Sequence, residues 1–184
     1  MRPAKISDRE LFEQLAQVFR RRGYDGASYA DLMKATGLVK ASLYHRFPGG
    51  KEEMVGAVQS EVDRHFAGYV LAPALEAGAP KERARRMAQR LREFYDSGRA
   101  WCLLDTLTLA ENRATLAHAR KSMEFWVERF ILVGRDAGLS AGAARKRAEE
   151  AVAAIEGGLI VARVSKNRRP FLRVLAELPK KLTG

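Results

Sequence analysis

Residues 28–53 read SYADLMKATGLVKASLYHRFPGGKEE and have the pattern of two short helices joined by a tight turn. The turn contains Gly37, and glycine readily adopts the left-handed conformation that ends a helix. In the second helix Leu43 and Phe47 are expected to face a core, whereas most of the side chains around them are polar. A pair of helices with this turn is typical of a helix-turn-helix, so the pattern predicts a DNA-binding head near the N-terminus.

Helical signals dominate the rest of the chain. Ser7 and Ser28 each begin a stretch with the spacing of a capping box, Gly23 is expected to end the first helix, and Pro179 is expected to follow the last one. Beyond the head, helices are expected at residues 51–71, 81–97, 100–110, 113–137, 140–164 and 170–177. No segment has the two-residue alternation of a strand. The sequence therefore predicts an all-α fold of about nine helices.

The composition is that of a folded protein with a large positive charge. The net charge of +11 favours a polyanionic partner, but basic residues extend over the whole chain, so charge alone does not identify DNA. The single cysteine, Cys102, cannot form an internal disulfide, which is typical of a cytoplasmic protein. No apolar stretch is long enough to span a bilayer, so no membrane partner is expected. The chain has no nucleophile elbow, phosphate loop or zinc signature, and we expect no enzyme activity, no cofactor and no metal site.

The N-terminal third resembles the DNA-binding domain of the TetR family of bacterial transcriptional regulators. The resemblance covers residues 5–55 and rests above all on KASLYHRF at 40–47, preceded by ATGL at 35–38 and followed by KEE at 51–53. It implies a regulator that binds DNA through the second helix of this motif.

Two positions depart from the family pattern. Val39 stands where a small hydroxyl residue is common, so it cannot cap the recognition helix, but it can give an apolar contact to a thymine methyl group. Arg46 stands where an aromatic residue is frequent and adds a candidate phosphate contact. Both positions are expected to affect which operator is bound.

The other expected contacts follow from position in the motif. Residues 40–42 form the first turn of the recognition helix and are best placed to reach base edges or nearby phosphates. Ser28, at a helix start, is expected to hold a phosphate with its hydroxyl and the free backbone N–H groups. The resemblance implies phosphate contacts for Tyr44 and His45, and Lys51 is expected to act similarly. The predicted DNA-binding residues are Ser28, Val39, Lys40, Ala41, Ser42, Tyr44, His45, Arg46 and Lys51.

The domain boundary is expected inside the fourth helix, between a helix-turn-helix domain at residues 1–55 and a helical effector-binding and dimerisation domain at residues 56–184. In the second domain, apolar residues recur every three or four positions from Ala144 to Ala162, as a narrow stripe. Such a stripe suits a subunit interface, and the resemblance implies that the last two helices pair with their mates. A core stripe within one chain is the alternative. The predicted interface comprises Ala148, Val152, Ile155, Leu159, Ala162, Phe171 and Leu175.

Aromatic residues in the second domain mark a candidate effector site. They fall on segments that surround a ligand cavity in the family, and aromatic walls with a few polar groups suit a small, flat, apolar molecule. Ordinary core aromatics are the alternative. The predicted ligand-binding residues are Phe94, Trp101, Leu104, Asp105, Phe125, Trp126 and Phe130.

Together these features predict a homodimer that binds a palindromic operator in double-stranded DNA. We expect a ligand-responsive repressor that a small-molecule effector releases from the operator. Two other functions are left open. A non-specific architectural DNA-binding protein would use the basic body as much as the head, and a small helical enzyme would need a convergent catalytic set that the sequence does not offer.

Overall fold

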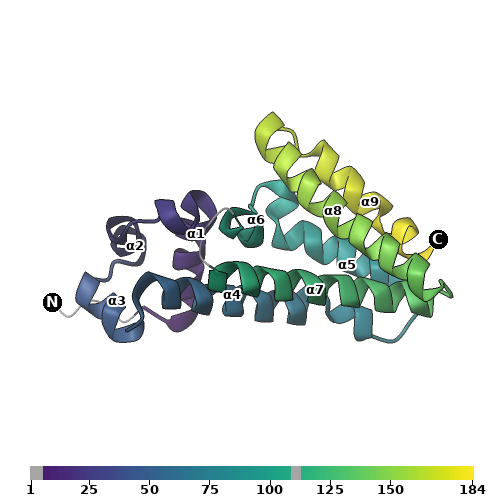
Figure 1. The fold of residues 1–184 in the computed structure, drawn as a ribbon. Helices are drawn as coiled ribbons and strands as arrows, with labels where there is room; N and C mark the ends of the chain where they lie inside the picture. The colour runs from purple at the N-terminus through teal and green to yellow at the C-terminus, as the bar shows by residue number, and fades with distance from the viewer. Residues whose placement is uncertain (1–5, 109–112) are drawn as a thin grey trace. The chain divides into compact units, whose positions relative to one another are not determined.

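The computed structural model describes residues 6–108 and 113–184. Every regular element within these ranges is helical, which confirms the predicted all-α fold (Figure 1). The elements are α1 (Asp8–Gly26), α2 (Tyr29–Thr36), α3 (Lys40–Arg46), α4 (Gly50–Tyr69), the 3-10 helix η1 (Ala72–Leu75), α5 (Pro80–Phe94), the 3-10 helix η2 (Asp96–Gly98), α6 (Leu103–Leu107), α7 (Arg113–Asp136), α8 (Ala141–Ser165) and α9 (Arg169–Thr183). The helix predicted at 100–110 is observed as the shorter α6, and its last two predicted residues lie outside the described ranges. None of the described helices combines the length and apolar character needed to cross a bilayer.

Serine side chains begin three of the helices by pairing backbone N–H groups that the first turn leaves free. Ser7 and Ser140 each accept a hydrogen bond at 3.2 Å from the backbone N–H three residues further along the chain. At α2 the capping box is reciprocal, because Ser28 accepts from the Asp31 N–H and Asp31 accepts from the Ser28 N–H, both at 3.2 Å. The box predicted at Ser28 is therefore confirmed.

Pro179 lies inside α9, which contradicts the prediction that the last helix ends before it. Proline lacks an N–H donor and its ring crowds the preceding turn, so it normally ends or bends a helix. Here the helix continues because Leu178 and Leu182 are buried on either side of the proline. In addition, the Arg147 guanidinium donates to the Lys181 carbonyl at 3.2 Å, close to the end of the helix.

Contacts divide the chain into two compact units. The first comprises Met1–Asp63 and Leu103–Ala119, and the second comprises Arg64–Cys102 and Arg120–Gly184. The first unit therefore extends beyond the predicted boundary at residue 55 and includes α6.

The core of the first unit explains why α6 belongs to it. Leu103 and Leu107 of α6 are buried in the same apolar cluster as Phe19 of α1. The two helices approach closely at Gly23, where an added Cβ would lie 3.3 Å from the Thr106 carbonyl oxygen. Gly23 has a φ of 67° and produces a kink in α1, at the position where the first helix was predicted to end.

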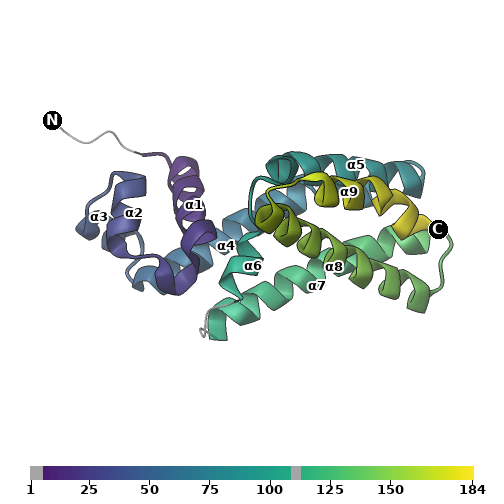
Figure 2. The same ribbon diagram turned by 90° about the horizontal axis from the view of Figure 1, so that it is seen from above.

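In the second unit α8 lies along α9, and α9 also packs against α5 (Figure 2). The apolar stripe of α8 from Ala144 to Ala162 is buried in this unit. The apolar periodicity of α8 thus serves the fold of a single chain.

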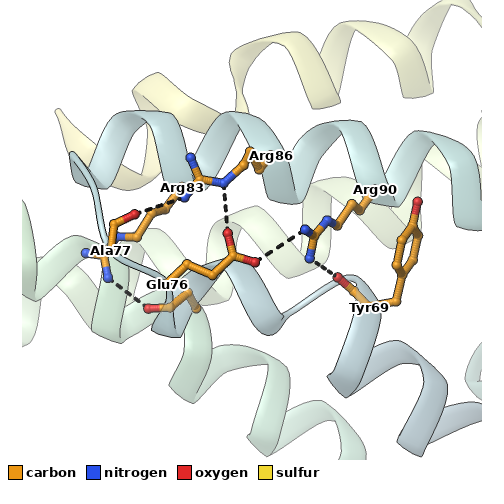
Figure 3. Close-up of polar contacts among 7 residues, drawn as sticks. Tyr69, Glu76, Ala77, Arg83, Arg86 and Arg90 are labelled. Atoms are coloured by element: carbon orange, nitrogen blue, oxygen red, sulfur yellow. Dashed lines mark hydrogen bonds and ion pairs between the residues drawn. The ribbon is translucent and has the colours of Figure 1, made fainter.

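A polar network in the second unit holds the connector between α4 and α5 (Figure 3). Glu76 accepts hydrogen bonds from Arg86 at 3.0 Å and from Arg90 at 3.3 Å. The Arg83 side chain is only 8% exposed; it donates to a carbonyl of η1 at 2.9 Å and pairs with Asp136 at 2.6 Å. These contacts tie η1 to α5 and α5 to the end of α7.

Candidate nucleic-acid interface

The turn between α2 and α3 has the geometry predicted for it. Gly37 is left-handed, with φ 67° and ψ 5°, and its N–H donates to the Met33 carbonyl. The buried Thr36 hydroxyl donates to the Leu32 carbonyl at 2.8 Å and accepts from the Leu38 N–H at 3.3 Å. Because the backbone groups of the turn are paired in this way, α3 is held at a defined angle to α2.

The recognition helix α3 has a buried face and an exposed face. Leu43 is fully buried, and Phe47 directly after the helix is almost so. The Phe47 ring meets Phe12 of α1 edge-on, with ring centroids 6.4 Å apart. The other face carries the residues predicted from this helix to bind DNA, which are exposed except for the half-buried Ser42: Val39, Lys40, Ala41, Ser42, Tyr44, His45 and Arg46.

Val39 begins the recognition helix without capping it. No side-chain hydrogen bond is made at this N-cap, as expected for valine. The residue is 61% exposed. An apolar side chain in this position matches the C5 methyl group of thymine, the apolar feature of the major groove.

Lys40 lies over a pair of stacked tyrosines. The rings of Tyr29, at the start of α2, and Tyr44 of α3 are parallel to within 15°, with centroids 5.3 Å apart. Lys40 Nζ lies 5.1 Å from the centroid of the Tyr29 ring and 5.8 Å from that of Tyr44. Cations are attracted to the faces of aromatic rings. The positive charge is therefore held at the first turn of α3.

Arg46 is paired within the first unit. Its Nη1 donates to Asp8 Oδ1 at 2.7 Å and joins the end of α3 to the start of α1. The phosphate contact predicted for Arg46 would therefore compete with a carboxylate of the protein.

The Ser28 hydroxyl is used by the cap of α2. It donates to Asp31 Oδ2 at 2.6 Å. This hydrogen bond, with a second from the Ser28 backbone N–H, holds the pKa of the Asp31 carboxyl below its ordinary value. A phosphate contact by Ser28, as predicted, would form beside this carboxylate.

Lys51 joins the start of α4 to the corner between α1 and α2. Its Nζ donates to the Ala27 carbonyl at 3.2 Å and lies 4.6 Å from the centroid of the Tyr24 ring. The charge predicted to clamp a phosphate is thus already oriented by two partners in the protein.

The residues that form this head match a known family. Residues 11–58 fit the model described as "Bacterial regulatory proteins, tetR family". The N-terminal head is a DNA-binding domain of the TetR family. The helix-turn-helix of α2 and α3 is accordingly the DNA-binding head of a transcriptional regulator.

Two curated relatives extend the similarity to most of the chain. The HTH-type transcriptional regulator LmrA of Bacillus subtilis is 24% identical over 179 residues, which cover 94% of this chain and 95% of the relative. The uncharacterized HTH-type transcriptional regulator YxaF of the same organism is 21% identical over 178 residues, which cover 94% of this chain and 93% of the relative. Both relatives are described as regulators.

Solved structures share the fold over both units. A TetR transcriptional regulator from Legionella pneumophila has a TM-score of 0.85 at 20% identity, covering 96% of this chain and 98% of that one. The regulatory protein TetR from Rhodobacter sphaeroides has a TM-score of 0.82 at 22% identity, covering 94% and 97%. At these identities the likeness shows that the chain has the TetR fold.

Rings predicted to surround an effector pack against other rings of the second unit. Trp126 stacks on Phe66 with centroids 4.0 Å apart and an interplanar angle of 8°. Phe94 meets Phe66 edge-on at 5.0 Å. Trp101 instead contacts the Arg163 guanidinium, 4.8 Å from the ring centroid. Face-to-face contact at 4.0 Å leaves no room for a ligand between Trp126 and Phe66 as they stand.

The seven predicted effector residues divide between the two units. The second unit contains Phe94, Trp101, Phe125, Trp126 and Phe130, and the first contains Leu104 and Asp105. Three hollows in the described part of the second unit have volumes of about 590, 470 and 770 Å³, and none of the seven residues lines any of them. The effector site stays a prediction.

The stripe predicted for the subunit interface is buried within the chain. An exposed fraction of 5% or less is found for Ala148, Val152, Ile155, Leu159, Ala162, Phe171 and Leu175. The packing is close at Gly158 of α8, where an added Cβ would lie 3.2 Å from the Cα of Phe171 in α9. These side chains lie in the core of one chain, which is the alternative that the sequence left open, and the subunit interface stays a prediction.

The partners of the DNA-binding side chains were not predicted. Tyr29 and Tyr24 lie on either side of Ser28, and aromatic residues so close to the motif were a usable signal. Asp8 is 38 residues from Arg46 in sequence, and no local pattern links the two. Sequence periodicity shows which face of α3 is exposed, but it does not show which neighbours orient the side chains on that face.

Proposed function

We propose that this regulator is a ligand-responsive repressor that binds a palindromic operator as a homodimer and is released from it by a small molecule. The observation that carries the proposal is the two-faced recognition helix, with Lys40 and Tyr44 on the surface and Leu43 fully buried behind them. A short helix of this kind is held against the core by its apolar face and has a polar face toward the solvent. Such a helix can enter a major groove and place its first turn against base edges.

A homodimer is proposed because a single head contacts few base pairs. The recognition helix has seven residues, and useful specificity in a genome needs a longer site than one such helix can cover. Two heads related by a two-fold axis would bind half-sites whose centres are about 34–36 Å apart, or a multiple of that spacing.

An exposed apolar face of α8 offers a surface for this homodimer. Ile160, Val161 and Val164 are 37%, 48% and 76% exposed. Helical spacing puts them on one face with Gly157, where an added Cβ would meet nothing within 4 Å. Because this face is separate from the buried stripe, a second copy could pack on it without disturbing the α8–α9 core. Small and branched side chains allow two helices to approach closely.

A small-molecule effector is proposed to bind among the aromatic rings of the second unit. Since Phe66 and Trp126 are stacked face to face, a ligand that enters between them must move at least one ring. Such a ligand binds one conformation better than another, and this difference in affinity is what can change DNA binding.

Selection from a library of random duplexes with the full chain tests the operator. We expect bound duplexes to converge on an inverted repeat, with half-sites separated as two major-groove heads require. Convergence on a single, unrepeated half-site, or no convergence at all, would contradict the proposal.

Thermal unfolding in the presence of small apolar compounds tests the effector. A compound that binds the folded chain raises its melting temperature, and we expect such a compound to weaken binding of the selected operator. Compounds that stabilise the chain and leave operator affinity unchanged would show that binding is not coupled to release.

A further inference from the structure

The Tyr29 ring joins the two helices of the motif by stacking on Tyr44, and Tyr29 is not among the predicted DNA contacts. It is the first residue of α2 and is half-buried, whereas Tyr44 is 41% exposed. In the stacked pair, Tyr29 is therefore the inner ring and Tyr44 the outer one. An exposed ring supported in this way has fewer orientations to lose when it binds.

Lys40 adds a positive charge to the stacked pair of Tyr29 and Tyr44. Its ammonium group lies within 6 Å of both ring centroids, at 5.1 and 5.8 Å, which is the range of cation–π attraction. Lysine has a long, flexible side chain, and ordering it costs conformational entropy. Contact with the rings orders Lys40 before DNA arrives and so lowers that cost on binding.

The hydroxyl end of Tyr29 is held at the start of α4. An added Cβ on Gly50 would lie 3.0 Å from Tyr29 Oη and 3.7 Å from Tyr44 Cε1, so both rings approach the backbone at this glycine. Burial, and next a hydrogen bond with Tyr44, raise the pKa of Tyr29 to about 12.

We propose that Tyr29 is a positioning residue for DNA binding, which holds the Tyr44 ring and the Lys40 ammonium group in the orientation that meets the phosphate backbone. Tyr29 acts through these two residues and need not touch DNA. The inference rests on the proposed operator binding, since it concerns how the head prepares that contact.

Three full-length variants and the selected operator test this role. Tyr29→Ala removes the inner ring, Tyr29→Phe keeps the ring, and Met33→Ala is the control, since it truncates another half-buried side chain of α2 that is not one of the two stacked rings. Operator affinity is measured by fluorescence anisotropy over a range of salt concentrations, and thermal unfolding is followed in parallel. Salt dependence reports how many phosphates the protein neutralises, which a purely structural role would not change.

We expect Tyr29→Ala to weaken operator binding about tenfold, as the removal of a charge-assisted hydrogen bond would. The slope of log affinity against log salt should become shallower by about 0.9 for each phosphate that the variant no longer neutralises. Tyr29→Phe should restore most of the affinity and slope, and Met33→Ala should keep both, whatever its melting temperature. The effect of Tyr29→Ala should also shrink when Lys40 and Tyr44 are already replaced by alanine.

If Tyr29→Ala binds the operator with the affinity and salt slope of the unaltered chain, the inference about Tyr29 is overturned and the proposed function still stands. The same holds for a Phe variant no better than the Ala variant, because the ring would then not be what positions the contact. Failure of the unaltered chain to bind any duplex selectively would instead overturn the proposed function, and the inference with it.

Discussion

Arg46 Nη1 lies 2.7 Å from Asp8 Oδ1, so the last residue of the recognition helix is bound to the first residue of α1. The Arg46 side chain is 34% exposed and the Asp8 side chain 81%, which makes this a surface ion pair worth about 0–1 kcal/mol. A DNA phosphate and the Asp8 carboxylate are both anions and would compete for the same guanidinium. We therefore expect Asp8 to limit how much Arg46 can add to DNA affinity.

Replacing Asp8 by asparagine should tighten DNA binding. The change frees Arg46 for a phosphate and removes a negative charge, so the salt slope should steepen by about 0.9 for each further phosphate that is neutralised. Glu13→Gln is the matched control, because it removes an equal charge from α1 at a residue paired with Arg9. Salt titrations of operator binding compare the two variants, and equal behaviour would mean that only net charge matters.

Val39 should make the operator sensitive to thymine methyl groups. Uracil in place of thymine removes one methyl, and at the thymine facing Val39 affinity should fall about fourfold, from a loss of about 0.8 kcal/mol of apolar burial. Val39→Ser should abolish this difference and raise the melting temperature, because serine can cap α3, which adds about 1 kcal/mol of stability. Binding of thymine and uracil duplexes is compared site by site. If every uracil duplex binds the unaltered chain like its thymine parent, Val39 makes no such contact.

The exposed face of α8 should hold the homodimer. Val161→Glu places a charge in the middle of that face, and burying an unpaired charge is costly, so the chain should become monomeric. Leu75→Glu is the control, since Leu75 is an equally unusual apolar side chain, 63% exposed, in η1. Light scattering after size-exclusion chromatography gives the mass of each variant. A Val161→Glu chain with the mass of the unaltered protein would rule this face out as the interface.

Arg83 should matter more for stability than its neighbours on α5. Arg83→Leu leaves the half-exposed Asp136 and a carbonyl of η1 without their partner, and we expect a loss of about 2 kcal/mol in the free energy of unfolding. Arg85→Leu breaks only an exposed pair with Glu82, worth about 0–1 kcal/mol. Urea unfolding of both variants measures the difference. Equal midpoints would show that the buried pair adds nothing.

Much of the head could be predicted because its signals are local. A serine followed three residues later by an acidic residue caps α2 by its own chemistry, and only glycine adopts φ 67° at the turn without strain. The end of the turn at Gly37 determines where α3 begins, and the position of that start determines which face of α3 is exposed. Such features need no knowledge of distant contacts.

The sequence could not decide between alternatives where a local pattern has more than one possible partner. The period of α8 shows an apolar stripe from Ala144 to Ala162, but the pattern is the same whether α9 or a second subunit covers it. Aromatic residues predict a pocket and a filled core equally well, and the contact of Phe66 with Trp126 is of the second kind. Pro179 continues a helix because distant residues bury its neighbours, which no rule on proline alone contains.

Operator binding by the Lys40→Ala/Tyr44→Ala variant, compared with the unaltered chain, tests most directly whether the exposed face of α3 recognises DNA. Affinities for the selected operator and for a scrambled duplex are measured at the same salt concentration. The unaltered chain should prefer the operator by about a thousandfold or more, the usual range for specific recognition, and the variant should lose most of this preference. A variant that keeps the preference, or an unaltered chain that binds both duplexes equally, would place DNA binding elsewhere on this basic protein.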